Sequence, residues 1–251
     1  MAKKIPYGLT DYFRIVTEDF YYVDKTKYIE DLEKTAAFLF LIRPRRFGKS
    51  LFLNMLNCYY DVKYADRFEE LFGNQYIGKH PTAEQGKYLV LRFNFSMVRA
   101  TDDKLEAAFN RHISLETAYF ASVYASYFKP DFQEQLKLIP EAAGRLEYIC
   151  LCAKEQGLSI YLLIDEYDNF TNTILSSKGN DVYHSLTHDS GFYRSFFNVV
   201  KGVTTGAEAP VKRMFITGVS PVTLDDVTSG FNIGTNITTD ERFNSMVGFS
   251  E

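Results

Sequence analysis

Three consecutive residues, Gly48, Lys49 and Ser50, have the types and order found in phosphate-binding loops. In such a loop, backbone N–H groups and a helix N-terminus face the phosphates, the lysine reaches the β- and γ-phosphates, and the hydroxyl holds Mg²⁺. The three residues follow an apolar run and precede apolar residues at helical spacing. This context favours a phosphate site over a chance match in a solvated loop.

The loop departs from the complete phosphate-loop pattern, which has glycine at the position of Arg43, and Pro44 stiffens it further. Arginine side chains bind phosphate well, but a surface cluster that balances nearby acids explains Arg45 and Arg46 equally well. We expect the nucleotide-binding segment to comprise Arg43, Pro44, Arg45, Arg46, Phe47, Gly48, Lys49, Ser50 and Leu51.

A second group of candidate residues ends the apolar stretch YLLIDEYDN. Acids at the tip of a parallel strand can hold Mg²⁺ and polarise an attacking water in phosphoryl transfer. We therefore assign the metal to Asp165 together with Ser50, and the role of catalytic base to Glu166. The alternative is that acids at a strand end simply meet solvent. Asp168 is interpreted as a loop cap.

A third candidate lies where the apolar stretch RMFITGVS ends. Thr217, or else Ser220, would contact the γ-phosphate from a neighbouring strand, and we count Thr217 with Lys49 and Glu166 as catalytic.

Two other groupings carry weaker signals. His184 and His188 have the i, i+4 spacing of metal ligands, but their segment is polar and indicates solvated histidines. Asp102-Asp103-Lys104 has the spacing of a metal nuclease motif, and we interpret its acids as caps of a helix.

Strands that alternate with helices are expected to position these residues. Pro140 and Gly157 suit the start and stop of one helix, and Asp24 and Thr26 are plausible caps of another that begins near Tyr28. The alternation predicts a three-layer α/β fold with a mainly parallel central sheet and helices on both faces, and the Gly48-Lys49-Ser50 loop makes it a fold of the P-loop NTPase type. The predicted strands are 36–42, 87–96, 159–169 and 213–219, and the polar stretches 171–191 and 223–251 are predicted to be long loops.

Composition excludes several classes of protein. Among 251 residues, 46% are hydrophobic and 24% charged, which is typical of a globular chain. The formal charge of −4 gives no overall cationic field for nucleic acid or anionic lipid. The three cysteines have neither disulfide nor zinc spacing, and no apolar run is long enough to cross a bilayer. We expect a cytoplasmic protein without membrane contact.

The segments IPYGLTDYFRI, YYVDKTKYIEDL, FLFLIRPRRFGKSLFLNML and YLLIDEYDN together resemble the AAA-ATPase-like family. The similarity extends from about Ile5 to the end of the chain and includes FITGVSPV. In that family the loop is commonly written R-P-R-R-F-G-K-S, so Arg43 is ordinary there. The resemblance implies that Gly48, Lys49 and Ser50 bind ATP.

The resemblance also implies metal and catalytic roles for Asp165 and Glu166, and a sensor role for Thr217. It places Tyr22, Asp24 and Lys25 in a family motif, for which packing against the nucleotide is one hypothesis. We divide the chain into an N-terminal motif (1–35), a nucleotide-binding core (36–222) and an irregular C-terminal segment (223–251). Family members often continue into a PD-(D/E)XK nuclease-like domain, of which this sequence shows no convincing copy.

The sequence thus predicts an Mg²⁺-dependent ATPase that acts as a nucleotide-driven switch, and the resemblance implies nucleic acid as a partner of a linked nuclease-like domain. A scaffold that binds nucleotide without hydrolysis is the main alternative. A small-molecule kinase is disfavoured by Glu166 directly after Asp165, and direct DNA or RNA binding by the acidic net charge. The sequence does not predict an oligomeric state.

Overall fold

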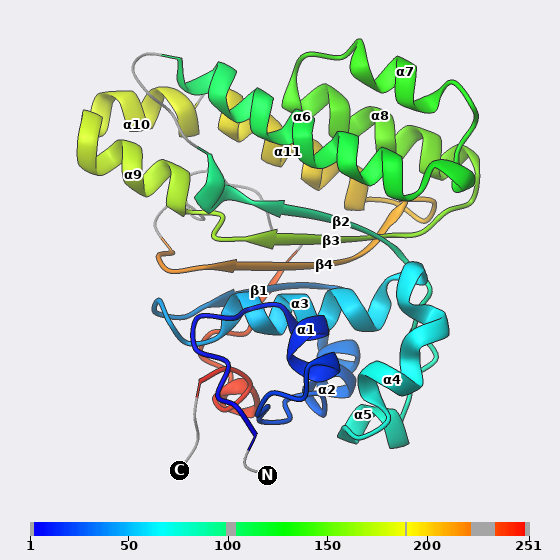
Figure 1. Ribbon diagram of the computed structural model, residues 1–251. Helices are drawn as coiled ribbons and strands as arrows, with labels where there is room; N and C mark the ends of the chain where they lie inside the picture. Colours follow the sequence, from blue (N-terminus) through cyan, green and yellow to red (C-terminus); the bar gives the residue numbers. More distant parts are fainter. Residues whose placement is uncertain (1–2, 99–103, 189, 222–233, 249–251) are drawn as a thin grey trace.

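The computed structural model describes residues 3–98, 104–188, 190–221 and 234–248. They form three layers, with a parallel β-sheet between two sets of helices (Figure 1). This is the α/β fold that the alternation of strands and helices predicted.

The sheet has the strand order β2-β3-β4-β1-β5, and every pairing is parallel. The carboxyl ends of its strands therefore lie along one edge. In particular β4 lies between β1 and β3, which carry the two strongest motifs at their ends. The strands are β1 (Phe38–Ile42), β2 (Leu89–Asn94), β3 (Ile160–Asp165), β4 (Val211–Gly218) and β5 (Thr235–Asn236).

Both faces of the central strands are buried, as continuous apolar runs require. Along β3, Ile160, Leu162 and Ile164 pack into one hydrophobic cluster, whereas Tyr161 and Leu163 pack into the other. This alternation follows from the two-residue period of a strand. It fixes the register of β3, because a shift by one residue would exchange the two faces.

One set of helices covers each face (Figure 1). The first set is α1 (Tyr12–Thr17), α2 (Tyr28–Thr35), α3 (Lys49–Tyr60), α4 (Phe68–Phe72) and α5 (Tyr76–Lys79). The second is α6 (Leu105–Val123), α7 (Phe132–Lys137), α8 (Ala142–Glu155), α9 (Asn169–Lys178), α10 (Asn180–Thr187) and α11 (Phe192–Thr204). Short 3₁₀ turns are η1 (Val62–Arg67), η2 (Phe95–Met97), η3 (Ala125–Tyr127) and η4 (Glu241–Phe243).

The prediction of a long loop at 171–191 was wrong, because α9 and α10 occupy most of it. The segment is polar overall, but Ile174, Tyr183 and Leu186 are buried. A few buried apolar residues therefore suffice to hold α9 and α10 against each other and α10 against α11.

The prediction that Asp24 and Thr26 cap α2 was also wrong, since α2 has no side-chain cap. An Asp24 carboxylate oxygen accepts from the N–H of Tyr76 at 2.7 Å, and the Thr26 hydroxyl accepts from the N–H of Ile77 at 3.1 Å. The two side chains cap α5 instead. Part of the N-terminal family motif thus connects helices that are distant in sequence.

No helix in the described ranges is both long and apolar enough to cross a membrane. Of the segment predicted to be irregular, residues 234–248 contain β5 and η4, and the rest of 223–251 lies outside the described residues. The acids Asp102 and Asp103 likewise lie outside them.

Candidate functional site

The loop between β1 and α3 is built on two left-handed residues. Arg46 has a φ of 69° and Gly48 a φ of 85°, and helix α3 begins directly after Gly48, at Lys49. Only glycine adopts this conformation without strain, which explains Gly48. The turn is made three to five residues after Arg43, so the chain does not need glycine at position 43.

Lys49 lies across the loop that precedes it. Its side chain is only 5% exposed, and its ammonium donates to the carbonyl oxygens of Arg43 at 2.8 Å and of Pro44 at 2.9 Å. Burial lowers the pKa of Lys49, while the charges of Asp165 and Glu166 act in the opposite direction. The structure therefore brings this cation and the acids at the tip of β3 into one electrostatic environment.

The three arginines of the loop have different surroundings. The Arg43 guanidinium donates to the carbonyl oxygen of Thr238 and lies 3.4 Å from Oδ1 of Asn244, so it faces the C-terminal segment. Arg45 and Arg46 are exposed. The charge of Arg45 lowers the pKa of Glu166, which places Arg45 on the side of the β3 acids.

Asp165 ends β3 and is fully buried. The hydroxyl of Thr217, on the adjacent strand β4, donates to Asp165 Oδ1 at 2.6 Å. Asp165 Oδ2 has no hydrogen-bond partner among the described residues. A buried carboxylate oxygen without a partner is unfavourable unless an ion, a water or a ligand group contacts it.

Glu166, the next residue, has a φ of 51°, in the left-handed region that non-glycine residues rarely adopt. Such local strain is often found at functional sites. Burial raises the pKa of the Glu166 carboxyl, and the neighbouring Asp165 raises it further. The carboxyl is thus tuned in the direction that suits a proton acceptor working near neutral pH.

This shift predicts a pH effect on stability. The pKa of Glu166 in the folded chain is higher than its ordinary value of 4.5, so the folded chain binds this proton more tightly than the unfolded chain does. The protonated group therefore stabilises the fold below pH 4.5, and this contribution is lost as the pH rises through the raised pKa. In urea unfolding from pH 4 to 8, Glu166→Gln should gain stability relative to the parent as pH rises above about 4.5. Parallel curves for the two proteins would contradict this, and Glu106→Gln on the surface of α6 is the control.

Asp168 connects the ends of β3 and β4, and this role was missed in the sequence. It is 1% exposed, and its carboxylate accepts from the N–H of Val219 at 3.1 Å, the N–H of Ser220 at 2.6 Å and the Asn172 amide at 2.9 Å. We interpreted it as a loop cap, but its partners include Val219, which directly follows β4 and is 51 residues away in sequence. A second acid shortly after Asp165-Glu166 was the only signal in the sequence.

Tyr167 reinforces the same connection. Its N–H donates to the Thr217 carbonyl at 3.0 Å, and its hydroxyl donates to the Ser220 carbonyl. A Cβ on Gly218 would lie 2.2 Å from a ring carbon of Tyr167, so only glycine permits this approach. Ser220, our second sensor candidate, is held through its backbone.

An apolar cavity of about 230 Å³ opens beside the phosphate loop. The loop contributes Phe47, the N-terminal segment contributes Tyr22 and Lys25, and Val247 comes from the C-terminal segment. The Lys25 ammonium donates to the Ser245 carbonyl at 2.7 Å and so closes one side. Two of the three family-motif residues, Tyr22 and Lys25, therefore lie next to the loop, whereas Asp24 points to α5.

The alternative metal site is not supported. His184 lies on α10 and His188 directly after its end, with their Nδ1 atoms 3.1 Å apart. Across the ranges that the structure describes, no group of three or more His, Cys, Asp or Glu side chains could hold a metal ion by itself.

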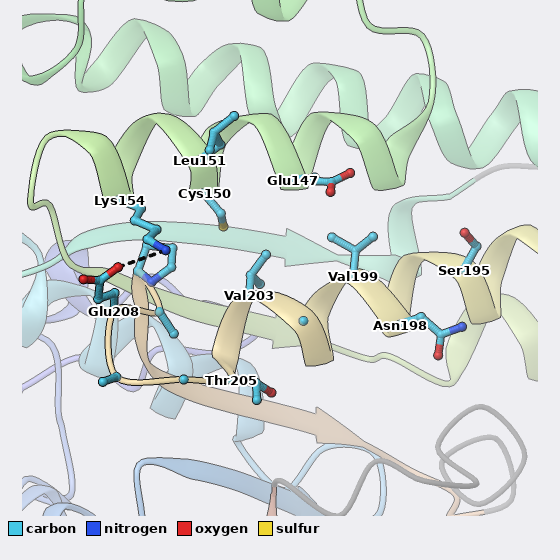
Figure 2. A pocket seen from close by; sticks show the side chains of 15 residues that line it. Glu147, Cys150, Leu151, Lys154, Ser195, Asn198, Val199, Val203, Thr205 and Glu208 are labelled. Atoms are coloured by element: carbon cyan, nitrogen blue, oxygen red, sulfur yellow. Dashed lines mark ion pairs between the residues drawn. The ribbon is translucent and has the colours of Figure 1, made fainter.

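A larger cavity of about 840 Å³ lies between α8 and α11 (Figure 2). It is lined by the residues just before β4, including Pro210, and bordered by the ion pair of Lys154 with Glu208 at 3.1 Å. It therefore lies at the amino ends of the strands. Ligands of open α/β sheets bind at the carboxyl ends, where Lys49 and Asp165 are.

The fold and the site together define a nucleotide-binding domain of the P-loop class. The defining features are a parallel sheet, a loop with a lysine between β1 and α3, and an acid at the end of β3, two strands from β1 in the sheet.

The sequence family described as "Predicted AAA-ATPase" matches residues 6–228, and the chain belongs to it. Membership supports the binding of ATP in general terms. Over 257 aligned residues the chain is 27% identical to an uncharacterised protein in the vnfD 5′ region of Azotobacter chroococcum mcd 1. The match covers 99% of this chain but 43% of that protein, so the chain spans less than half of its relative. No solved structure matches significantly.

Proposed function

We propose that this chain binds ATP with Mg²⁺ and hydrolyses it, as a nucleotide-driven switch. One observation carries the proposal: buried Lys49 and the pair Asp165-Glu166 share one edge of the sheet, and Asp165 Oδ2 has no partner among the described residues. A cation, a buried acid with an unpartnered oxygen for a metal ion, and a second acid with a raised pKa are what phosphoryl transfer to water requires.

The phosphates of ATP would lie on the N-terminus of α3. The loop N–H groups and the Lys49 ammonium face negative charge there, and Lys49 would exchange its contacts with the loop carbonyls for phosphate oxygens. The apolar cavity between Tyr22, Phe47 and Val247 would take the adenine ring.

The residues present fit Mg²⁺, which needs few protein ligands because it retains several waters and binds phosphate oxygens. Ser50 at the start of α3 and Asp165 Oδ2 would hold it, and Thr217 keeps Asp165 in position from β4. When bound, the ion would neutralise charge on the phosphates.

Glu166 would accept a proton from the attacking water. Its backbone strain and raised pKa support that role over a purely structural one. Thr217 is fully buried and donates to Asp165, so we assign its sensor role to the coupling of β4 with Asp165 rather than to direct phosphate contact.

The switch would act on a partner. Our hypothesis is that this partner is a linked nuclease-like domain with a nucleic acid substrate. A nucleotide-binding scaffold without hydrolysis is the second candidate. The position of the Arg43 side chain favours this scaffold function, because its contacts with Thr238 and Asn244 direct the guanidinium away from the loop.

Replacing Lys49 with Ala tests nucleotide binding. The variant should bind labelled ATP at least about tenfold more weakly in the presence of Mg²⁺, because a charge-assisted contact to phosphate is lost. Isothermal titration of the parent and the variant measures this, and Lys129→Ala, which removes an exposed ion-paired lysine, is the matched control. Equal affinities for parent and Lys49→Ala would refute the proposed site.

A further inference from the structure

A third cavity lies at the edge of the sheet formed by β2, the first strand in the sheet order. The strand binds β3 on one side, where the N–H of Leu89 donates to the Ser159 carbonyl. Backbone groups alternate along a strand, so Tyr88, Val90, Arg92 and Asn94 direct theirs to the opposite, open side.

Two of these four outward positions are occupied. Tyr88 pairs with the segment 60–62, and the N–H of Val90 donates to the hydroxyl of Tyr124 at 3.1 Å. For the outward N–H and C=O of Arg92, no partner occurs in the part of the chain that the structure describes. Backbone groups of an edge strand that lack a partner in the protein can bind a ligand.

A cavity of about 350 Å³ opens at Arg92, between α3 and α6. Arg92 and Glu116 both line it, yet no ion pair within 4 Å joins them. The Arg92 guanidinium donates to Asn54 at 2.7 Å, which uses one of its five N–H groups. Burial raises the pKa of the Glu116 carboxyl and the charge of Arg92 opposes this, so the two groups sense each other across the cavity.

Two other charged residues line the cavity and already have partners. Lys63 lies 3.6 Å from the buried carboxylate of Asp61, and the Asp11 carboxylate accepts from the N–H of Arg14 as the cap of α1. The side-chain amide of Asn57, by contrast, lines the cavity without a partner among the described residues. The cavity is thus lined by the Arg92 guanidinium, the Glu116 carboxyl, the Asn57 amide and the backbone of β2, and it is large enough for a small ligand.

We propose that this cavity binds a small zwitterion of the size of a free amino acid. Its carboxylate would bind the Arg92 guanidinium, its ammonium would bind Glu116, and its side chain would lie under Tyr119 and Met97, which are exposed at the rim. A molecule with opposite charges at its two ends complements the opposite charges of Arg92 and Glu116 in one cavity, whereas a simple anion or cation leaves one of them unmatched.

The test is isothermal titration of the full chain, without nucleotide, against the proteinogenic L-amino acids. At least one should bind with a dissociation constant below about 1 mM. The corresponding amine without the carboxylate, and the acid without the amine, should each bind at least about tenfold more weakly. Glu116→Gln and Arg92→Gln should weaken binding to a similar extent, and Glu106→Gln, on the exposed face of α6, should leave it unchanged.

Two outcomes would overturn the proposal: no amino acid binds at concentrations up to about 10 mM, or Glu116→Gln binds as well as the parent. Circular dichroism verifies that each variant is folded. Lys49→Ala should retain amino acid binding, so a failure here and a failure of the ATP proposal are distinguishable.

Discussion

The Glu166→Gln protein is expected to hydrolyse ATP about 10²–10⁴-fold more slowly than the parent, the usual contribution of a general base. Its affinity for ATP should change by less than about threefold, because the assigned phosphate and metal contacts belong to Lys49, Ser50 and Asp165. The amide has nearly the shape of the carboxyl but accepts no proton from water.

Release of inorganic phosphate at saturating ATP and Mg²⁺ measures the first quantity, and titration with labelled ATP the second. Glu208→Gln is the matched control, since Glu208 lies at the opposite end of the sheet beside the cavity of Figure 2. A parent that binds ATP and releases no phosphate would support the scaffold alternative, whereas unchanged hydrolysis in Glu166→Gln would exclude Glu166 as the base.

Replacing Asp168 with Asn should lower the free energy of unfolding by about 2–4 kcal/mol. The carboxylate accepts from the N–H groups of Val219 and Ser220 while nearly fully buried. Oδ2 accepts from both N–H groups and Oδ1 also contacts the N–H of Val219, so the amide loses the negative charge that strengthens these bonds and sets its NH₂ group against the N–H of Val219 or of both residues.

Urea unfolding monitored by circular dichroism gives this difference. Asp131→Asn is the control, because Asp131 is exposed and makes no side-chain cap at the start of α7. If Asp168→Asn unfolds at the same urea concentration as the parent, the link between β3 and β4 does not depend on this carboxylate.

The fold could be predicted from the sequence because its strands are continuous apolar runs with helical patterns between them. The strand predicted at 36–42 is β1 (Phe38–Ile42), and the helix predicted between Pro140 and Gly157 is α8. Prediction was wrong where periodicity was weak, at α9 and α10. In that segment the burial of a few apolar side chains stabilises two helices, although most of the residues are polar.

The location of the site could also be predicted, since a parallel sheet brings the ends of β1 and β3 to one edge whatever the loops do. The hydrogen-bond partners of individual side chains could not be predicted. Asp24 bonds to α5, Arg43 to residues near 240, and Asp168 to β4. Each contact joins segments more than 50 residues apart, and no local pattern encodes such a pairing.

The C-terminal segment is also part of the loop's surroundings. The Thr238 carbonyl accepts from the Arg43 guanidinium, the Gly248 N–H donates to the Phe47 carbonyl at 2.7 Å, and β5 pairs with β1. An expression fragment cut to the family boundaries at 6–228 would delete all three supports. The shortest fragment suited to biochemical work on nucleotide binding therefore extends at least to Gly248.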